Sequence, residues 1–314
     1  MESTLIVEKL SVFYISEREV VRAVDGVSFE LTHNYCIGLA GESGCGKSTL
    51  GTALLRSVQP PGKIMAGSVT LDGTDIFSIS NSDFDKKIRW KKIAMIFQGA
   101  MNSLNPVFTV GKQMNEILEE HKFPGNISAC IKAALQQVLL DESIVKKYPH
   151  ELSGGQKQRI IIAMALLLKP QILIADEPTT SLDVLVQAQI INLLKSLKKQ
   201  FGLSILFISH DLGVISELAD SVAIMYAGQI VEFGASRHIY SSPRHPYTQK
   251  LIAAVPRMKD ERENLESLKG KPPDLAALQE GCRFADRCPL AMDICKLNPH
   301  MTEVEGAMVR CWLY

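Results

Sequence analysis

The chain has 314 residues, including 34 basic and 34 acidic ones, and its formal net charge is zero. A chain of this length can bury a full core in one large domain and leaves room for a smaller one. Zero net charge, with 46% hydrophobic and 22% charged residues, is ordinary for a globular protein. It gives no electrostatic sign of binding to nucleic acid or to an anionic membrane surface, and we expect no nucleic-acid partner.

Apolar stretches in the chain are too short to span a bilayer. The best candidate, IIIAMALLL at 160–168, has nine residues, whereas a membrane helix needs about twenty. The first ten residues, MESTLIVEKL, carry an acidic residue at position 2 and contain no signal-peptide core. We therefore expect a cytosolic protein, in which a cysteine cluster binds metal or does redox chemistry more often than it forms disulfides.

Short apolar runs alternate with longer helical patterns through most of the chain, which is typical of an α/β fold with a mostly parallel core sheet. Runs that stay apolar and then end in polar residues predict strands buried on both faces. They lie at 36–43, 93–98, 171–178 and 204–211. In such sheets, functional residues lie at the carboxyl ends of the strands.

Two regions depart from this pattern. From about 101 to 168 we predict a helical insertion, with helices at 111–121, 128–139 and 153–168. From about 235 onward the composition changes to SSPRHPYTQ and then to KDERENLESLKGKPP, before four cysteines near the end. We expect an appended carboxyl-terminal extension there, with a small cysteine-stapled unit at its end.

The stretch GESGCGKST at 41–49 fits the pattern G-x-x-x-x-G-K-[ST] of a phosphate-binding loop. Its glycines let backbone N–H groups turn toward a phosphate chain, and the helix that follows offers its N-terminus to the negative charge. Lys47 would reach the β- and γ-phosphates, and Ser48 Oγ would ligate Mg²⁺. Cys45 is best interpreted as a small space-filler, because the backbone does the binding. The predicted ATP-binding residues of the loop are Gly41, Glu42, Ser43, Gly44, Cys45, Gly46, Lys47, Ser48 and Thr49.

A second candidate group follows the predicted strand at 171–178. In ILIADEP, Asp176 and Glu177 come directly after four apolar residues. Asp176 can hold Mg²⁺ through its water shell, and Glu177 can orient and polarise an attacking water. A strand that simply ends in polar residues is the alternative, and the phosphate loop upstream makes it the weaker one.

The predicted helix at 153–168 begins with the residues Ser153, Gly154, Gly155 and Gln156. Ser153 and Gln156 match a capping box, so an ordinary helix cap is one interpretation. Capping does not explain two consecutive glycines, which cost helix stability but let backbone N–H groups approach an anion. The stretch LSGGQ at 152–156 resembles the signature motif of ATP-binding-cassette (ABC) ATPases.

Other motifs of that family appear in the family's order over residues 4–234. Gln98 in MIFQ resembles the Q-loop, Asp183 in SLD the D-loop, His210 in ISHD the switch histidine, and Tyr14 in LSVFY the aromatic side chain that stacks on adenine. The resemblance implies an ABC-type P-loop ATPase domain with an antiparallel β subdomain.

The resemblance also implies a mechanism in which two cassettes dimerise head to tail around two ATP molecules. The signature residues 153–156 would then complete the partner's ATP site. Glu177 would be the general base, His210 would contact the γ-phosphate, and Gln98 would link Mg²⁺ and the water to the helical insertion. Mg²⁺ would be held through Ser48, Gln98 and Asp176.

Two classes of ABC ATPase compete for this chain: a transporter subunit, and a soluble ATPase of DNA maintenance or translation. The DNA-maintenance type needs a long coiled coil between phosphate loop and signature, but here only about a hundred residues without sustained heptads separate them. The translation type would need two cassettes in one chain. The transporter subunit is therefore favoured.

The extension narrows the choice further. SSPRHPYTQKLIAAVP (241–256) and GCRFADRCPLAMDIC (281–295) resemble the ATPase subunit of dipeptide/oligopeptide importers, in the peptide/nickel branch. This implies an ATPase domain at 1–240 and an extension at 241–314, with peptides as cargo and oligosaccharides or nickel as alternatives. One departure is Gly99–Ala100, where the family often has Asp-Pro, in a loop near the docking site of the membrane subunits.

The resemblance also implies the partners. They are a second ABC ATPase subunit in a homo- or heterodimer, two transmembrane permease subunits and an extracytoplasmic substrate-binding protein. The chain would then lie peripherally on the cytoplasmic face of the plasma membrane.

Four cysteines in the extension, Cys282, Cys288, Cys295 and Cys311, have five, six and fifteen residues between them. Structural zinc usually uses tighter pairs, whereas the ligand spacing of iron–sulfur clusters is more permissive. Relatives with this pattern include proteins with a 4Fe–4S cluster, so the resemblance favours that cluster, with zinc as the alternative. We expect a structural role, because few large apolar residues lie near the cysteines.

Overall fold

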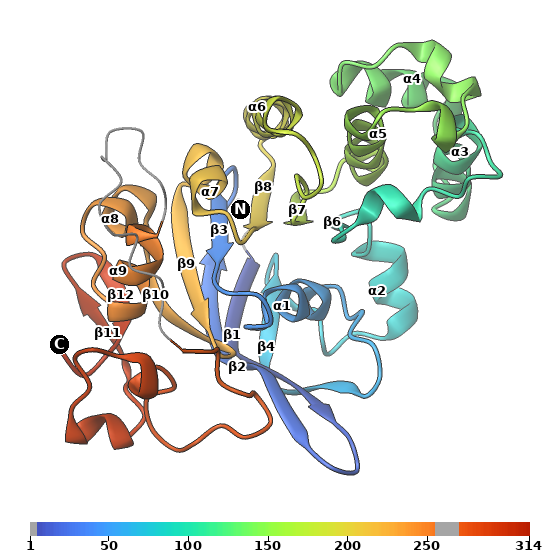
Figure 1. The fold of residues 1–314 in the computed structure, drawn as a ribbon. Coiled ribbons are helices and arrows are strands. Elements are labelled where there is room, and N and C mark those ends of the chain that lie inside the picture. The colour runs from blue at the N-terminus through green and yellow to red at the C-terminus, as the bar shows by residue number, and fades with distance from the viewer. Residues whose placement is uncertain (1–4, 255–269) are drawn as a thin grey trace. The chain divides into compact units, whose positions relative to one another are not determined.

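The computed structural model describes residues 5–254 and 270–314, and these form two compact units. Unit 1 contains Thr32–Tyr35 and Ser78–Leu206. Unit 2 contains the remaining described residues, which are 5–31, Cys36–Phe77, 207–254 and 270–314. Both units combine strands and helices (Figure 1), so the α/β class predicted from the sequence is confirmed.

Unit 2 contains a four-stranded antiparallel sheet with the strand order β2-β1-β4-β5. Its strands are β1 (Leu5–Ile15), β2 (Val20–Leu31), β4 (Gly62–Leu71) and β5 (Thr74–Asp75). In β1, Leu5 pairs with Leu31 on one side and with Leu71 on the other, and all three side chains are buried. This sheet is the antiparallel β subdomain that the family resemblance implies.

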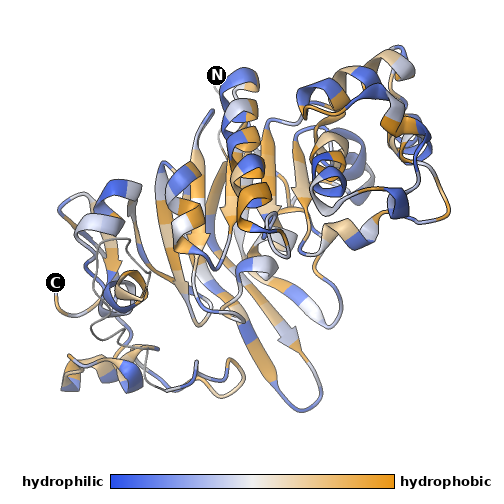
Figure 2. Cartoon of the chain, turned by 45° about the horizontal axis from the view of Figure 1, so that its top comes forward, coloured by the Kyte–Doolittle hydropathy of each residue, from blue (hydrophilic) through white to orange (hydrophobic). Residues whose placement is uncertain are grey.

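Unit 2 also contains a second run of strands, in the order β11-β12-β10-β9-β3. They are β3 (Cys36–Ala40), β9 (Ser221–Tyr226), β10 (Gln229–Ala235), β11 (Met301–Val304) and β12 (Ala307–Arg310). Every residue of β3 and β9 is buried, as the apolar run at 36–43 predicts for β3, whereas β9 is a strand that the sequence interpretation did not name. Figure 2 shows these central strands in the hydrophobic colour. β3 and β9 are parallel, whereas β9, β10, β12 and β11 pair antiparallel, so the run is mixed rather than mostly parallel.

The carboxyl-terminal extension contributes the last two strands of that run, which the sequence interpretation did not foresee. Glu305 and Gly306 form the two-residue turn between β11 and β12, both with positive φ (47° and 79°), as a type I′ hairpin turn requires. β12 pairs with β10, where Phe233 faces Met308. The extension therefore adds to a sheet of the unit instead of only following it.

Four helices complete unit 2: α1 (Lys47–Leu54), α7 (Leu212–Leu218), α8 (Ser236–Ser241) and α9 (Pro246–Ala253). The turn into α9 is fixed by Glu232, a buried carboxylate whose oxygens accept from the backbone N–H groups of Arg244 and His245 at 2.8 and 2.9 Å. The His245 side chain then caps the helix by accepting from the Tyr247 N–H at 3.1 Å. These bonds place Tyr247 at the first turn of α9.

Unit 1 contains strands in the order β8-β7-β6, where β8 begins in unit 1 and ends in unit 2. The strands are β6 (Ile93–Ile96), β7 (Ile172–Asp176) and β8 (Ser204–Ile208), and β6 and β7 are parallel and wholly buried. The helices are α2 (Asn81–Lys87), α3 (Val110–Glu120), α4 (Ile127–Gln137), α5 (Gly154–Leu166) and α6 (Val184–Phe201). α3, α4 and α5 begin and end within two residues of the helices predicted for 101–168.

Side-chain caps explain where several helices of unit 1 begin. Thr109, Asn126 and Ser153 accept from backbone N–H groups in the first turns of α3, α4 and α5. α6 ends at Gly202, which has the left-handed φ of 61° that favours glycine. Among residues 5–254 and 270–314, no helix combines the length and apolarity needed to cross a membrane.

Candidate functional site

The phosphate loop, residues 41–46, joins the end of β3 to the start of α1. Gly41 and Gly46 have φ of 151° and 107°. A Cβ atom at Gly41 would collide with the carbonyl oxygen of Met225, and one at Gly46 with that of Ala23. Both obstacles are backbone atoms, which cannot move aside as a flexible side chain can. The loop geometry therefore requires glycine at these two positions, as the sequence pattern predicts.

Lys47 is held across the phosphate loop, and only 6% of this residue is exposed. Its Nζ donates to the carbonyl oxygens of Gly41 and Glu42 at 2.8 and 3.0 Å and lies 3.8 Å from Cys45 Sγ. Burial raises the pKa of the Cys45 thiol although the Lys47 ammonium opposes the shift. A neutral, buried thiol agrees with the space-filling role expected for Cys45.

Tyr14 in β1 comes close to the first turn of α1. Its hydroxyl oxygen lies 3.4 Å from Thr49 Oγ1, so the two predicted ATP-binding residues lie together in unit 2 although 35 residues separate them. Ser48, next to Thr49, is exposed at the start of α1.

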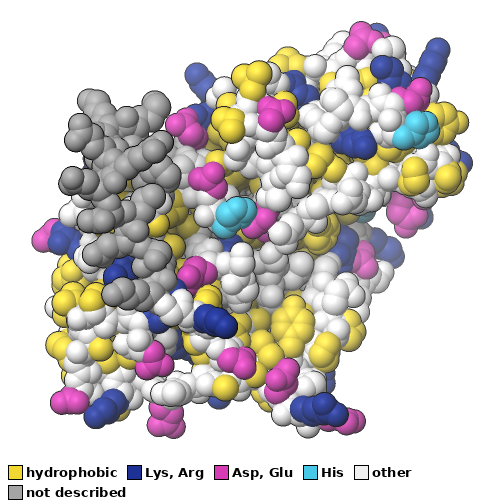
Figure 3. All heavy atoms as spheres, viewed as in Figure 1, with side chains coloured by type: hydrophobic (Ala, Val, Ile, Leu, Met, Phe, Trp, Pro, Cys, Tyr) yellow, Lys and Arg dark blue, Asp and Glu magenta, His cyan; other side chains and the backbone are white. Residues whose placement is uncertain are grey.

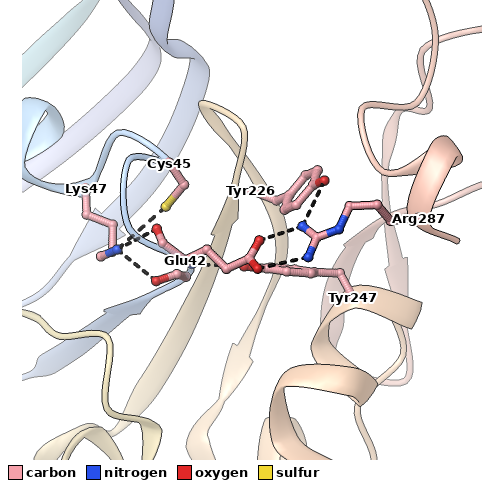
Figure 4. Close-up of polar contacts among 7 residues, drawn as sticks. Glu42, Cys45, Lys47, Tyr226, Tyr247 and Arg287 are labelled. Carbon is pink, nitrogen blue, oxygen red and sulfur yellow. Dashed lines mark hydrogen bonds and ion pairs between the residues drawn. The ribbon is translucent and has the colours of Figure 1, made fainter. Parts of the chain in front are cut away.

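Residues of the carboxyl-terminal extension also contact the phosphate loop, which the sequence interpretation missed (Figure 4). Arg287 donates to both carboxylate oxygens of Glu42, at 2.6 and 3.0 Å. Tyr247 accepts from the Glu42 backbone N–H at 3.0 Å. No local pattern signals these contacts, because 245 and 205 residues separate the partners.

In unit 1, Asp176 and Glu177 lie at the end of β7. Asp176 is 2% exposed, and Glu177 has a φ of 48°, in the left-handed region that a non-glycine residue adopts rarely. The Glu177 Oε2 atom accepts from Gln98 Nε2 at 2.9 Å and from Thr180 Oγ1 at 3.0 Å. Two predicted catalytic residues, Gln98 and Glu177, therefore share a hydrogen bond, and Thr180 is a further partner that the sequence interpretation did not name.

The signature residues begin α5. Ser153 Oγ accepts from the Gln156 N–H at 3.3 Å, and Gln156 Oε1 accepts from the Ser153 N–H at 3.0 Å, so the capping box is present. A Cβ atom on Gly155 would lie 2.8 Å from Val186 Cγ1, near the start of α6. The small glycine therefore lets the signature lie against the first turn of α6, which Asp183 caps by accepting from the Val186 N–H at 2.9 Å.

His210 and Gly99 occupy exposed loops in units 2 and 1, respectively. His210 comes shortly after β8 and just before Asp211, which caps α7.

Gly99 has a φ of 69°, and the N–H of Ala100 donates to the carbonyl oxygen of Phe97 at 3.1 Å. Proline at position 100 lacks that N–H, so an Asp-Pro pair would not form this bond.

The four cysteines of the extension are free thiols in unit 2. The N–H of Cys282 donates to the carbonyl oxygen of Cys295 at 2.8 Å, which brings the two cysteine-bearing turns together. Burial raises the pKa of Cys282 to about 11, and repulsion from the thiolates of Cys295, Cys311 and Cys288 adds to the shift. Across residues 5–254 and 270–314, no three His, Cys, Asp or Glu side chains are arranged to hold a metal ion.

One residue near the cysteines corrects the expectation that large apolar side chains are scarce there. Phe284 is 1% exposed and packs edge-on to Tyr226, with ring centroids 5.2 Å apart, and against Tyr247 at 5.4 Å. The extension therefore has an aromatic anchor of its own.

Two family models match the sequence. The model described as ABC transporter matches residues 24–180, and the one described as oligopeptide/dipeptide transporter, C-terminal region, matches residues 231–295. The first covers the phosphate loop, the signature and Glu177, and the second covers three of the four cysteines.

Relatives match over nearly their whole length. The oligopeptide transport ATP-binding protein AppD of Bacillus subtilis is 45% identical over 321 residues, which cover 100% of this chain and 98% of the relative. The dipeptide transport ATP-binding protein DppD of Bacillus subtilis is 42% identical and covered to 95%, and OppD of Haemophilus influenzae is 41% identical and covered to 98%.

Solved structures match the cassette part. The dimeric, post-hydrolysis structure of the ATP-binding cassette MJ0796 with ADP and Pi is 26% identical, with a TM-score of 0.66 over 74% of this chain and 99% of that chain. The cbiO1 protein of Clostridium perfringens, described as part of the ABC transporter complex cbiONQ, is 25% identical with a TM-score of 0.66 over 77% of this chain and 92% of that chain.

Proposed function

Because the chain belongs to the ATP-binding subunits of ABC transporters, and carries the oligopeptide/dipeptide transporter C-terminal region, we propose that it hydrolyses ATP to drive the import of dipeptides or oligopeptides. The observation that carries the proposal is the phosphate loop, whose backbone path excludes a side chain at Gly41 and Gly46. The peptide cargo rests on the full-length match to AppD and DppD. An oligosaccharide or nickel importer with the same type of subunit is the alternative.

ATP binding is assigned to the loop and to its surroundings in unit 2. The glycine-lined backbone at 41–46 and the N-terminus of α1 suit a triphosphate, because N–H groups there can face the anion. Lys47, now held by two loop carbonyls, would exchange these for phosphate oxygens. Tyr14 would pack against the adenine.

Hydrolysis is assigned to the group of residues at the end of β7. Glu177 would accept a proton from the attacking water, and its bonds from Gln98 and Thr180 hold the carboxylate in one orientation. Ser48, Gln98 and Asp176 are the proposed Mg²⁺ residues, since hydroxyl, amide and carboxylate oxygens are hard ligands of the kind Mg²⁺ takes. When bound, Mg²⁺ would neutralise charge on the β- and γ-phosphates. His210 would contact the γ-phosphate.

We also propose a head-to-tail dimer in which residues 153–156 complete the partner's ATP site. Val184 and Leu185, just after Asp183, are 82% and 70% exposed. Two large apolar side chains exposed beside the signature suit a surface that another subunit covers. Whether the partner is a second copy or a related ATPase subunit is a separate question, and we favour the related subunit.

The other partners follow from the family. Two transmembrane permease subunits and an extracytoplasmic substrate-binding protein would complete the importer, with this chain peripheral on the cytoplasmic side. Gly99–Ala100 lies in the loop proposed to meet the permease.

Residues 1–240 would be the ATPase domain and 241–314 the extension. No nucleic-acid partner is proposed, and Figure 3 shows basic and acidic side chains interspersed on the face in view.

For the extension we propose a thiolate-bound metal centre, with a 4Fe–4S cluster favoured and zinc as the alternative. Its donors would be the four free cysteine thiols of unit 2, where the bond from the Cys282 N–H to the Cys295 carbonyl oxygen joins two of the cysteine-bearing turns. The described side chains are not arranged to hold a metal ion in this structure, so binding would have to draw the thiols together. Such a centre, when bound, would tie Cys282, Cys288, Cys295 and Cys311 together and add folding free energy. Its role would be structural.

Two variants test the ATPase proposal. Glu177→Gln should bind ATP and dimerise but lose nearly all turnover, because the amide cannot accept the proton. Hydrolysis at the parent rate in this variant would refute the assignment of Glu177. Ser153→Arg should block the partner's site while leaving nucleotide binding to its own phosphate loop unchanged. Loss of binding in Ser153→Arg, measured by equilibrium titration of the monomer, would contradict the head-to-tail arrangement.

A further inference from the structure

Glu42, the second residue of the phosphate loop, is held from several sides within unit 2. Its carboxylate receives the guanidinium of Arg287 through two parallel bonds, its N–H donates to Tyr247 Oη, and its carbonyl oxygen accepts from Lys47 Nζ. Figure 4 shows Glu42 between Lys47 on one side and Tyr247 and Arg287 on the other. We call Glu42, Tyr247 and Arg287 the loop clamp.

The Arg287 pair has the geometry of a strong interaction. Its two bonds form the fork-to-carboxylate arrangement that fixes orientation as well as distance. The Arg287 side chain is 6% exposed and that of Glu42 22%, so solvent screens the pair only in part. A third bond, which the guanidinium donates to Tyr226 Oη at 3.3 Å, limits its movement.

Tyr247 fixes the backbone of Glu42 rather than its side chain. The ring is fully buried between Tyr226, at 4.6 Å between centroids, and Phe284. The hydroxyl therefore has a set position, and it satisfies an N–H that the loop does not bond internally. Tyr247 therefore bonds the peptide group that precedes Glu42, and Arg287 limits the movement of the residue that joins this peptide group to the next one.

Those peptide groups also hold the ammonium group of Lys47. The carbonyl oxygens of Gly41 and Glu42 accept from Lys47 Nζ, so a shift of the Glu42 backbone moves the site where this lysine lies. A loop that is already ordered loses less conformational entropy when it closes on a phosphate chain than a loop that must first be ordered.

We propose that Arg287 and Tyr247 are positioning residues of the nucleotide site, so that the carboxyl-terminal extension sets the phosphate loop in its binding conformation. This rests on the proposed function, in which the loop binds ATP. Both side chains would act through Glu42, which they bond directly, and not by contacting the nucleotide. The extension is thereby part of the nucleotide site rather than only an attachment to it.

The extension has other anchors that do not touch the loop. Arg283 forms an ion pair with Asp25 and donates to the carbonyl oxygen of Ala227. β12 pairs with β10, and Phe284 is buried in its aromatic cluster. The extension should therefore stay folded without the Arg287–Glu42 pair, and the effect of that pair on the loop can be measured separately.

The test is the dissociation constant of MgADP for the full-length chain, measured by calorimetric titration. Arg287→Ala and Glu42→Gln should each weaken binding about tenfold, because each breaks the charge-assisted pair that orders the loop. Because both variants break the same pair, the double variant should bind MgADP about as tightly as either single variant. Tyr247→Phe keeps the ring and should weaken binding severalfold. Arg287→Lys keeps the charge without the fork and should fall between Arg287→Ala and the parent.

Arg244→Ala is the matched control, because it removes an arginine–glutamate pair of the same extension, Arg244 with Glu305, and this pair does not bond the phosphate loop. It should leave MgADP binding unchanged. Hydrogen exchange of β12 amides should stay slow in Arg287→Ala. Parent-like affinity in Arg287→Ala and Glu42→Gln, additive losses in the double variant, or equal losses in Arg244→Ala would each overturn the proposal. A parent chain that binds no MgADP would instead refute the proposed function.

Discussion

Replacing Phe284 by alanine measures how much of the extension's stability comes from packing rather than from a metal centre. The ring is 1% exposed and contacts Tyr226, Tyr247 and His245, at centroid distances of 5.2, 5.4 and 5.7 Å. Truncating a buried phenylalanine costs about 3–5 kcal/mol, including the cavity that remains. Because β12 and α9 lie in the same unit, we expect most of this cost to appear as easier opening of the extension.

Native-state hydrogen exchange measures that opening free energy directly. A loss of 3 kcal/mol would speed exchange of β12 amides about a hundredfold, since 1.4 kcal/mol corresponds to a factor of ten. Leu290→Ala is the control, because Leu290 is 50% exposed in the same extension and should change exchange little. If Phe284→Ala speeds exchange less than about fivefold, packing does not hold the extension and the argument from this aromatic cluster is wrong.

Two further predictions concern His245 and the cysteines. Burial lowers the pKa of His245 to about 4, below its usual 6.5, so folding keeps it neutral. Below pH 6.5 the unfolded chain therefore binds a proton on His245 that the folded chain does not bind. The free energy of unfolding should be highest above pH 6.5 and should fall by about 3 kcal/mol as the pH drops to 4. Urea titrations should show a smaller fall for His245→Asn. Anaerobic purification should give a brown protein with about four irons per chain. Cys295→Ser should lose the iron yet keep MgADP binding, because the Arg283–Asp25 ion pair, β12 and Phe284 still anchor the extension that carries Arg287. A colourless sample with stoichiometric zinc would refute the cluster and support zinc.

The parts of the site that were predictable from the sequence are those built from consecutive residues. The phosphate loop depends on backbone angles at Gly41 and Gly46, and the capping box of Ser153 and Gln156 closes within one helical turn. Both leave a short local pattern, the glycine spacing and the S-x-x-Q cap, so a short motif is sufficient to find them, although the backbone atoms that exclude a side chain at the two glycines belong to the distant residues Met225 and Ala23. Assigning Gln98 and Glu177 to one site needed the family resemblance as well, because 79 residues separate them, and the hydrogen bond between them was not itself predicted.

Features that join distant segments were not predictable in this way. Arg287 lies in FADRCP, next to Cys288, and nothing in this stretch indicates that its partner is a carboxylate 245 residues away. The hairpin of β11 and β12 had a local turn signal in the glycine of Glu305–Gly306, but its pairing with β10 depends on which sheet edge is available. Edge pairing depends on the assembled unit, not on any stretch of sequence.

The distance along the chain between Glu42 and Arg287 also has a consequence for biosynthesis. The ribosome makes the phosphate loop early, and Arg287 follows 245 residues later. At about 5–20 residues per second, this interval is roughly 12–50 s. During that time the nascent cassette has its glycine loop but lacks the guanidinium that orders it, and Tyr247 arrives only shortly before. A chain terminated before residue 287 would lack Arg287, and one terminated before residue 247 would lack both groups, so tight nucleotide binding becomes a property that only nearly finished copies acquire in full.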